Sequence, residues 1–226
     1  MKKACFLLLL LIGISHFIYG QSTPIPPKVI IGISIDGLNH NYLTFFKNEL
    51  SAKGFKRLMQ ESTCLENVDY GYQSAGMAAD IATLYTGAIP YVHGIAGNTL
   101  FNRNAAKSSS ICLDATAHSF GLSPAYSAHR LQASTLTDQL DEASMGKSNI
   151  VSIAIDPTAA TLQAGHTGLA LWMDPETGRW NTSSYYQTAL PSWAGKTADD
   201  YLANRWEPLG IPALYHAIST SKTKTF

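Results

Sequence analysis

The sequence predicts an α/β fold, in which a mostly parallel, doubly wound sheet carries helices on both faces. The first observation is a pair of short apolar runs, VIIGISI at 29–35 and NIVSIAI at 149–155, which are typical of buried parallel strands. The second is that segments with helical spacing of apolar residues alternate with such runs. The third is that hydrophobic residues make up 46% of the 226 residues, which is enough for a packed core and excludes wholesale disorder.

In the first half of the chain, apolar spacing predicts three helices after the run at 29–35. They cover 41–52, 54–61 and 74–85, and the last of them ends before Gly87. A second strand is expected at 65–70.

In the second half, the segment STLTDQLDEA at 134–143 predicts another helix. A strand pair is expected at 169–173 and 180–186, because the turn-forming residues DPETG at 174–178 join the two runs. A last helix is expected at 198–205.

The first twenty residues have the pattern of a secretory signal peptide. Lys2 and Lys3 precede an apolar stretch at 4–14, and Gly20 is a small residue suited to the cleavage position. An uncleaved membrane anchor is the alternative for this segment. No later run of eighteen apolar residues exists, so the mature chain is expected outside the cytoplasm, periplasmic or secreted, without a membrane span.

The rest of the chain divides into three parts. Residues 21–28 contain three prolines and are expected as a linker, residues 29–215 as the α/β domain, and residues 216–226 as a disordered tail. We expect a monomer.

Charge and cysteine content exclude two classes of protein. The formal net charge is zero and only 14% of residues are charged, which argues against a nucleic-acid-binding surface. Three cysteines are too few for a disulfide-built scaffold. Whether Cys64 and Cys112 pair in an oxidising compartment stays open.

Asp36 is the first candidate site residue. It directly follows the run at 29–35, and ligands of doubly wound sheets bind beyond the carboxyl ends of strands. A carboxylate there can hold a hard metal ion. The alternative is a simple turn formed by Asp36 and Gly37.

Ser74 and Asn98 are the other candidates. Ser74 begins a predicted helix, where it can be a nucleophile near bound phosphate or a plain N-cap. Asn98 ends the glycine-rich turn HGIAGN and can donate through its amide. His93 in that turn, like His166, is more often structural than a ligand.

A series of short motifs runs from about Lys28 to about Tyr215. The series comprises VIIGISIDG at 29–37, GFKRLM at 54–59, YTG at 85–87, HGI at 93–95, Asn98, DQL at 138–140, AGH at 164–166, WMD at 172–174 and TSSYY at 182–186. In this order the motifs resemble the type I phosphodiesterase/nucleotide pyrophosphatase branch of the alkaline phosphatase superfamily. The series is closest to the secreted, phosphate-irrepressible alkaline phosphatases.

The resemblance implies the amino-terminal part of a truncated, alkaline-phosphatase-like fold with two zinc ions, acting on phosphate-ester small molecules or nucleotides. Asp36 matches the family's zinc-bound carboxylate, and Asn98 matches the asparagine that holds a phosphate oxygen. A hydroxyl nucleophile opens the helix before Tyr-Thr-Gly in the family. Two metal ions would activate it and stabilise the displacement.

Three departures from the family pattern put activity in doubt. Counting back from Gly87 places Met77 at the nucleophile position, with Ser74 as the nearest hydroxyl one turn earlier. Asp156 and Thr158 stand where the monoesterases carry Lys and Arg, and a carboxylate repels a phosphate dianion. The family's other zinc ligands lie further along a longer chain.

The leading hypothesis is therefore the amino-terminal portion of a phosphoesterase that is inactive as this chain. The alternative is a degenerate, non-catalytic member of the family that acts as an extracytoplasmic binding protein. A third hypothesis, an unrelated α/β binding module, would use the aromatic residues between Trp172 and Trp206.

Overall fold

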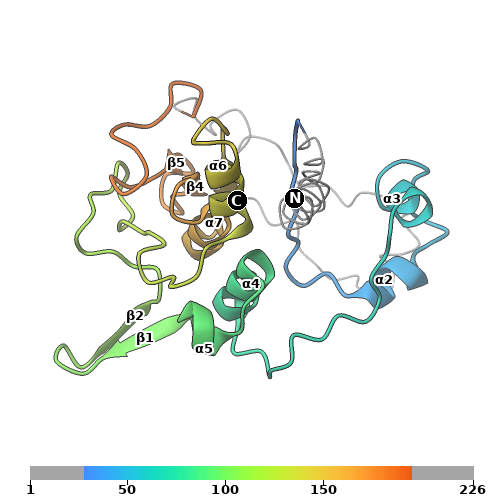
Figure 1. Ribbon diagram of the computed structural model, residues 1–226, viewed down its shortest axis with the longest axis horizontal. Coiled ribbons are helices and arrows are strands. Elements are labelled where there is room, and N and C mark those ends of the chain that lie inside the picture. The colour runs from blue at the N-terminus through green and yellow to red at the C-terminus, as the bar shows by residue number, and fades with distance from the viewer. Residues whose placement is uncertain (1–27, 195–226) are drawn as a thin grey trace, which may run out of the picture. The chain divides into compact units, whose positions relative to one another are not determined.

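The computed structural model describes residues 28–194, in two compact units divided between Gln60 and Glu61 (Figure 1). The predictions for the signal peptide, for most of the linker at 21–28, for the helix at 198–205 and for the tail fall outside the described residues. Within 28–194, no helix is long and apolar enough to cross a membrane.

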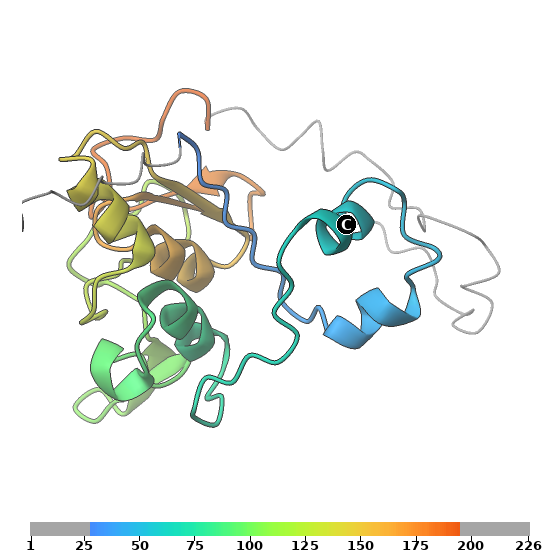
Figure 2. The ribbon, with the colours of Figure 1, turned by 45° about the vertical axis from the view of Figure 1, so that its right-hand side comes forward.

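The first unit contains α2 (His40–Phe45) and the greater part of α3 (Phe55–Glu61), drawn in blue to cyan in Figure 2. Asn39 begins α2, because its side chain accepts a hydrogen bond from the backbone N–H of Asn41 at 2.9 Å. Neither helix has a buried residue. The helix predicted at 54–61 is confirmed, whereas the one predicted at 41–52 is six residues long.

The strand predicted at 29–35 is wrong for this structure. Its residues are neither helix nor strand, and Val29 and Ile31 are 74% and 78% exposed. An apolar run becomes a strand only where a neighbour completes its hydrogen bonds and a surface covers it, and no described residue of the first unit covers this run. Asp36 and Gly37 form a turn after it, with Gly37 at φ 70.

The second unit contains four helices within its described part. They are α4 (Met77–Thr86), α5 (Pro90–His93), α6 (Leu136–Ala143) and α7 (Pro157–Ala164). Helix α6 begins with a capping box, in which the side chain of Thr135 accepts from the N–H of Asp138 and the Asp138 side chain accepts from the N–H of Thr135. Helix α7 begins at Asp156, whose carboxylate accepts from the N–H groups of Thr158 and Ala159.

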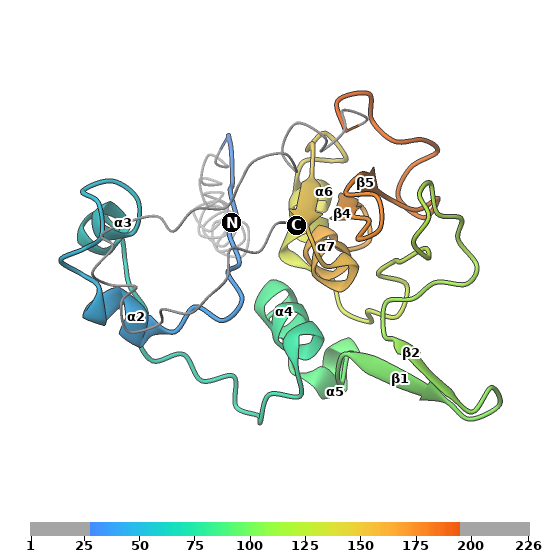
Figure 3. The same ribbon diagram turned by 180° about the vertical axis from the view of Figure 1, so that it is seen from behind.

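Two small sheets accompany these helices. Strands β3 (Val151–Ala154), β4 (Leu169–Met173) and β5 (Trp180–Asn181) form one sheet in the order β3-β4-β5. Helix α7 connects the parallel pair β3 and β4, and the tight turn after β4 gives the antiparallel pair β4 and β5. Strands β1 (Thr99–Asn102) and β2 (Lys107–Ser110) form a separate antiparallel hairpin, seen from behind in Figure 3.

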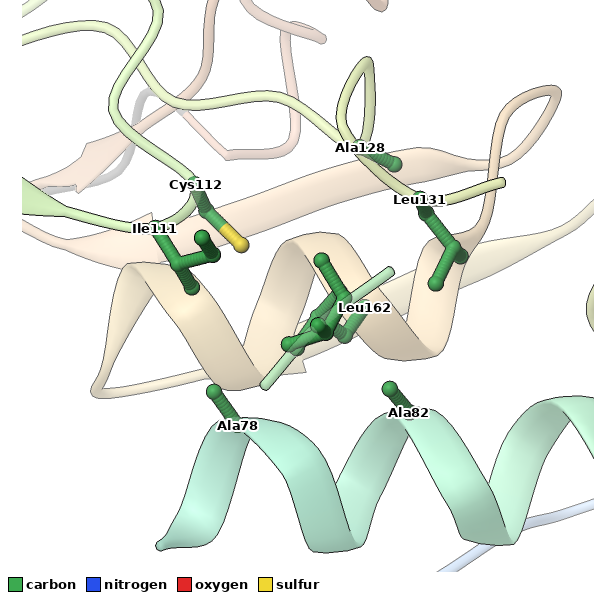
Figure 4. Packing of buried hydrophobic residues seen from close by; sticks show 8 residues of the cluster. Ala78, Ala82, Ile111, Cys112, Ala128, Leu131 and Leu162 are labelled. Carbon is green, nitrogen blue, oxygen red and sulfur yellow. The ribbon is translucent and has the colours of Figure 1, made fainter. Parts of the chain in front are cut away.

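The core lies between α4, α7 and the three-stranded sheet. Helix α7 contacts β3 and β4 as well as α4. Ala78 and Ala82 of α4 face Leu162 of α7, and small alanine side chains let the two helices approach closely (Figure 4). Cys112 closes this cluster as a buried free thiol, and burial raises its pKa to about 11.

Several element predictions for the second unit are confirmed and others are not. The predicted strand at 169–173 is β4, its partner begins at Trp180 but is two residues long, and α6 lies within 134–143. Residues 65–70 form no strand, and the helix expected to begin at Ser74 begins at Met77. Cys64 is exposed and, like Cys112, free, so the structure contains no disulfide between them.

Candidate phosphate site at the start of helix α4

The start of α4 is capped by a side chain that lies twenty residues further along the chain. Gly76 precedes the helix at φ 120 and offers no side chain, so Asn98 Oδ1 accepts from the backbone N–H of Ala78 at 2.9 Å. A Cβ at position 76 would lie 2.9 Å from both Asn98 Oδ1 and Nδ2, so only glycine permits this approach. Within the described residues, the Nδ2 donor of Asn98 has no partner.

Met77 is the first residue of α4, at the position where the resemblance places a hydroxyl nucleophile. Ser74 lies outside the helix, which corrects the prediction that it begins the helix or caps it. Its Oγ donates to Asp80 Oδ2 at 2.6 Å and accepts from the N–H of Gly76 at 3.3 Å. The break comes at Gly76, whose positive φ redirects the chain just before Met77.

Asp80 belongs to a hydrogen-bonded series that runs into the core. Tyr72 OH lies 3.2 Å from Asp80 Oδ1 and 2.8 Å from Thr83 Oγ1, and Thr83 Oγ1 lies 3.0 Å from Nε2 of the buried His93. The N–H of Ile95 donates to His93 Nδ1 at 3.1 Å, so the ring proton is on Nε2, which donates to Thr83.

Burial lowers the pKa of His93, in keeping with this neutral ring. Because both ring nitrogens bond within the protein, His93 has a structural role and does not offer a metal ligand.

His166 is a second histidine that the fold holds in place. Its Nδ1 lies 2.8 Å from Asp138 Oδ2 and its Nε2 lies 2.9 Å from the carbonyl oxygen of Leu131. Both partners are acceptors, so both nitrogens donate and the ring is an imidazolium. The hydrogen bond to Asp138 raises the pKa of His166, against the lowering effect of burial. Because both ring nitrogens are bonded to protein groups, His166 has no nitrogen left to bind a metal ion.

The residues that replace the monoesterase Lys and Arg have structural tasks. Asp156 is the N-cap of α7. Thr158 is buried, and its Oγ1 lies 3.3 Å from Ser110 Oγ. No cation replaces the missing pair at these two positions. Asp80 adds a further carboxylate in the first turn of α4.

The expected zinc site does not fit the residues that the structure describes. Asp36 is exposed in a turn of the first unit, and nowhere in 28–194 do three or more His, Cys, Asp or Glu residues gather as metal ligands would. Asp36 and Asn98 belong to different units, so their proximity stays a prediction.

The structure thus has an α/β scaffold in which an asparagine side chain caps the start of a helix. The sequence model of the type I phosphodiesterase/nucleotide pyrophosphatase family matches residues 30–209, and the chain belongs to that family.

Among curated proteins, the chain is 32% identical over 194 residues to alkaline phosphatase PafA of Elizabethkingia meningoseptica and 30% identical over 209 residues to alkaline phosphatase PhoV of Synechococcus elongatus. These matches cover 81% and 88% of this chain, but 35% and 38% of the relatives. A protein of Myroides odoratus named calcium-transporting ATPase is 33% identical over 204 residues, which are 86% of this chain and 37% of that protein.

The solved structures confirm the fold class. The crystal structure of wild-type PafA matches with a TM-score of 0.70 and 31% identity, over 78% of this chain and 36% of that one. A mutant of the same phosphatase matches with a TM-score of 0.72 and 30% identity, over 83% and 38%. The chain therefore has the α/β alkaline phosphatase fold and spans little more than a third of the relatives' length.

Proposed function

We propose that this chain is the amino-terminal, phosphate-ester-binding portion of an extracytoplasmic phosphoesterase, and that it does not hydrolyse esters by itself. The observation that carries the proposal is the Asn98 side chain fixed on the first turn of α4. The N-terminus of a helix offers backbone N–H groups and partial positive charge to an anion. The Asn98 amide would add a side-chain donor beside them.

The absence of turnover follows from the groups around that position. Met77 has a thioether, which cannot attack phosphorus as an alkoxide does. Ser74 lies outside α4, which begins at Met77, and one carboxylate at Asp36 is short of the three or four ligands that zinc needs. A two-zinc centre is expected from the resemblance only.

The substrate class proposed is a phosphodiester, such as two nucleosides joined through one phosphate. Asp80 in the first turn of α4 and Asp156 in place of a family cation both act against a dianion. A diester has a single negative charge and meets less repulsion than a monoester.

The alternative, a non-catalytic binding protein outside the cytoplasm, draws support from one observation. Met77 occupies the first helical position itself, so the missing hydroxyl is not explained by a shifted helix start. Both functions need the same phosphate site, and they differ in whether a hydroxyl at this position restores chemistry.

Two comparisons on the full chain test the proposal. Binding of a dinucleoside monophosphate, which is a phosphodiester with a single negative charge, is followed by calorimetry. It is expected for the unmodified chain and lost in Asn98→Ala, which removes the amide donor. Equal binding by both proteins would refute the phosphate site.

Hydrolysis of an aryl phosphodiester with added zinc is then measured for Met77→Thr against Met77→Ala, which removes the thioether without adding a hydroxyl. No turnover is expected in the unmodified chain, in Ser74→Ala or in Met77→Ala. Turnover by Met77→Thr would support the phosphoesterase, and its absence would support the binding protein. Zinc-dependent turnover by the unmodified chain that disappears in Ser74→Ala would instead make Ser74 the nucleophile.

A further inference from the structure

Asp114, Ser127 and His129 form a hydrogen-bonded series that the phosphate site at α4 does not use. Two backbone hydrogen bonds bring their segments together. The N–H of Asp114 donates to the carbonyl oxygen of Ala125 at 3.0 Å, and the N–H of Ser127 donates to that of Cys112 at 2.9 Å. The three side chains therefore meet although Asp114 and Ser127 are thirteen residues apart.

The direction of each hydrogen bond in this series is fixed by the carboxylate. Burial acts against ionisation of Asp114, but hydrogen bonds from Ser127 and Thr116 outweigh it and hold the pKa at about 2. Asp114 is thus an acceptor only, and Ser127 Oγ donates its single proton to Asp114 Oδ2 at 2.6 Å. Ser127 Oγ must then accept from His129 Nδ1, which lies 2.8 Å away.

A proton on Nδ1 leaves the lone pair of the neutral ring on Nε2. No described residue bonds to Nε2, and the His129 side chain is 38% exposed, so a small molecule can reach it. Catalytic and metal-binding histidines are oriented in this way, with one nitrogen held by an acidic relay and the other free. Too few other ligands surround His129 in the described structure for a metal ion, which leaves the lone pair as a nucleophile.

We propose that His129 Nε2 accepts a phosphoryl group, with Ser127 and Asp114 as positioning residues. The phosphoryl class rests on the proposed function, whereas the reactive lone pair rests on the geometry alone. With a phosphoramidate whose nitrogen is protonated as donor, Nε2 forms a bond to phosphorus, the P–N bond of the donor breaks, and neutral ammonia leaves with that electron pair. The positive charge gained by the ring is stabilised through Nδ1–H, Ser127 and Asp114, since His129 Nδ1 lies 3.6 Å from Asp114 Oδ2.

The test uses an internal control that the chain provides. His118 is also exposed, and its ring has no hydrogen-bond partner among the described residues. The unmodified chain is treated with phosphoramidate at about pH 8, where imidazoles are mostly neutral, and phosphorylation is followed residue by residue by mass spectrometry. His129 is expected to react about tenfold faster than His118, in line with the effect of partners that orient a histidine. Equal rates at the two rings would overturn the proposal.

Variants and a second reagent separate this proposal from the function of α4. Ser127→Ala is expected to lower the rate at His129 to that of His118, while His118→Gln leaves His129 unchanged. Asn98→Ala is expected to lose nucleotide binding and keep the phosphorylation of His129. Diethyl pyrocarbonate, an acylating reagent, reports on the lone pair alone, so a preference for His129 with it but not with phosphoramidate would refute the phosphoryl assignment. Nitrogen NMR shifts of the untreated protein that place the proton on Nε2 of His129 would refute the geometry.

Discussion

Two carboxylate–imidazole pairs of the second unit use the same residue types with opposite results. In the first, His166 contacts Asp138 directly and donates its other proton to the Leu131 carbonyl. In the second, Ser127 lies between Asp114 and His129, and Nε2 of the ring has no described partner. The two side chains are similarly exposed, at 34% and 38%, so exposure does not distinguish them.

The number of ring nitrogens that the protein occupies decides what each histidine can do. A ring with both nitrogens bonded to acceptors is locked as a cation and stabilises the fold. A ring with one nitrogen bonded is oriented and keeps a lone pair for chemistry. A histidine in a motif is therefore assigned a role only after both of its nitrogens are followed to their partners.

We call Asp138–His166 the closed pair, because both ring nitrogens are bonded, and Asp114–Ser127–His129 the open pair, because Nε2 has no described partner. The largest expected effect comes from a substitution at Gly165, which lies beside the closed pair. Gly165 adopts φ 70 and ψ −150, a region reserved for glycine, and a Cβ there would lie 2.6 Å from Asp138 Oδ1. Gly165→Ala is expected to cost about 3 kcal/mol of unfolding free energy from backbone strain and overpacking together. Urea denaturation measures this cost.

Gly146→Ala is the control, because Gly146 has φ 73 but nothing within 4 Å of an added Cβ, so a cost of about 1 kcal/mol is expected there. Equal costs would show that Asp138 yields without penalty.

Asp138→Asn weakens the same pair by removing a hydrogen-bond acceptor and the negative charge, without adding volume. The carboxylate accepts from Thr135, His166 and Thr167, and an amide offers one acceptor atom instead of two. The expected loss is about 2 kcal/mol, below that for a fully buried ion pair because solvent screens part of the His166 ring. Asp141→Asn on the same helix is the control and should change stability by less than about 0.5 kcal/mol. A loss as small as that of Asp141→Asn would mean that the pair contributes little.

The closed pair also predicts a pH dependence of stability. The pKa of His166 is raised above its ordinary 6.5 in the folded protein, so its contribution is complete below about pH 6.5 and is lost as pH rises through the raised value. Burial acts to raise the pKa of Asp138, but hydrogen bonds from His166 and Thr135 together outweigh it and lower the pKa. The contribution of Asp138 to stability is therefore present above about pH 3.8 and is lost toward acid.

The unfolding free energy, measured across pH, is expected to fall on the alkaline side in the unmodified chain and to flatten there in His166→Gln. This change is smaller than the loss in Asp138→Asn, because the mutation also removes the hydrogen bonds. An alkaline limb that His166→Gln leaves unchanged would assign it to another group.

The sequence alone predicted α6 from its apolar spacing and β4 from the turn-forming residues that follow its apolar run, and both lie where they were expected. Helix α7 was missed because six of its eight residues are buried, so it lacks the polar face that gives a helix its period. The run at 29–35 misled in the opposite way, since apolar residues indicate burial only if another surface covers them.

The candidate site was predictable in part. The resemblance identified Asn98, and the structure brings it to the start of α4, but its role with phosphate stays a prediction. The glycine at 76 that permits this contact carried no local signal. The relay from Asp114 to His129 depends on backbone pairing between distant segments, and the only trace of it in the sequence is the Ser-Ala-His triplet at 127–129.

The smallest expected effect comes from Thr116, which bonds to Asp114 of the open pair. Thr116 donates to Asp114 Oδ1 through both its N–H, at 2.9 Å, and its Oγ1, at 2.6 Å, whereas Ser127 holds Oδ2. Thr116→Ala removes one donor, so the pKa of Asp114 should rise above about 2. Because Asp114 stabilises the fold above 3.8 and loses that contribution toward its lowered pKa, the variant should begin to lose stability at a higher pH on acidification. A cost of about 0.5 to 1 kcal/mol in unfolding free energy near pH 5 is expected by urea denaturation.

Thr116→Ser keeps the hydroxyl and should match the unmodified chain. Since Thr116 and Ser127 bond to different oxygens, the proton should stay on Nδ1 of His129 in both variants, and its movement to Nε2 would show that the relay needs Thr116 as well.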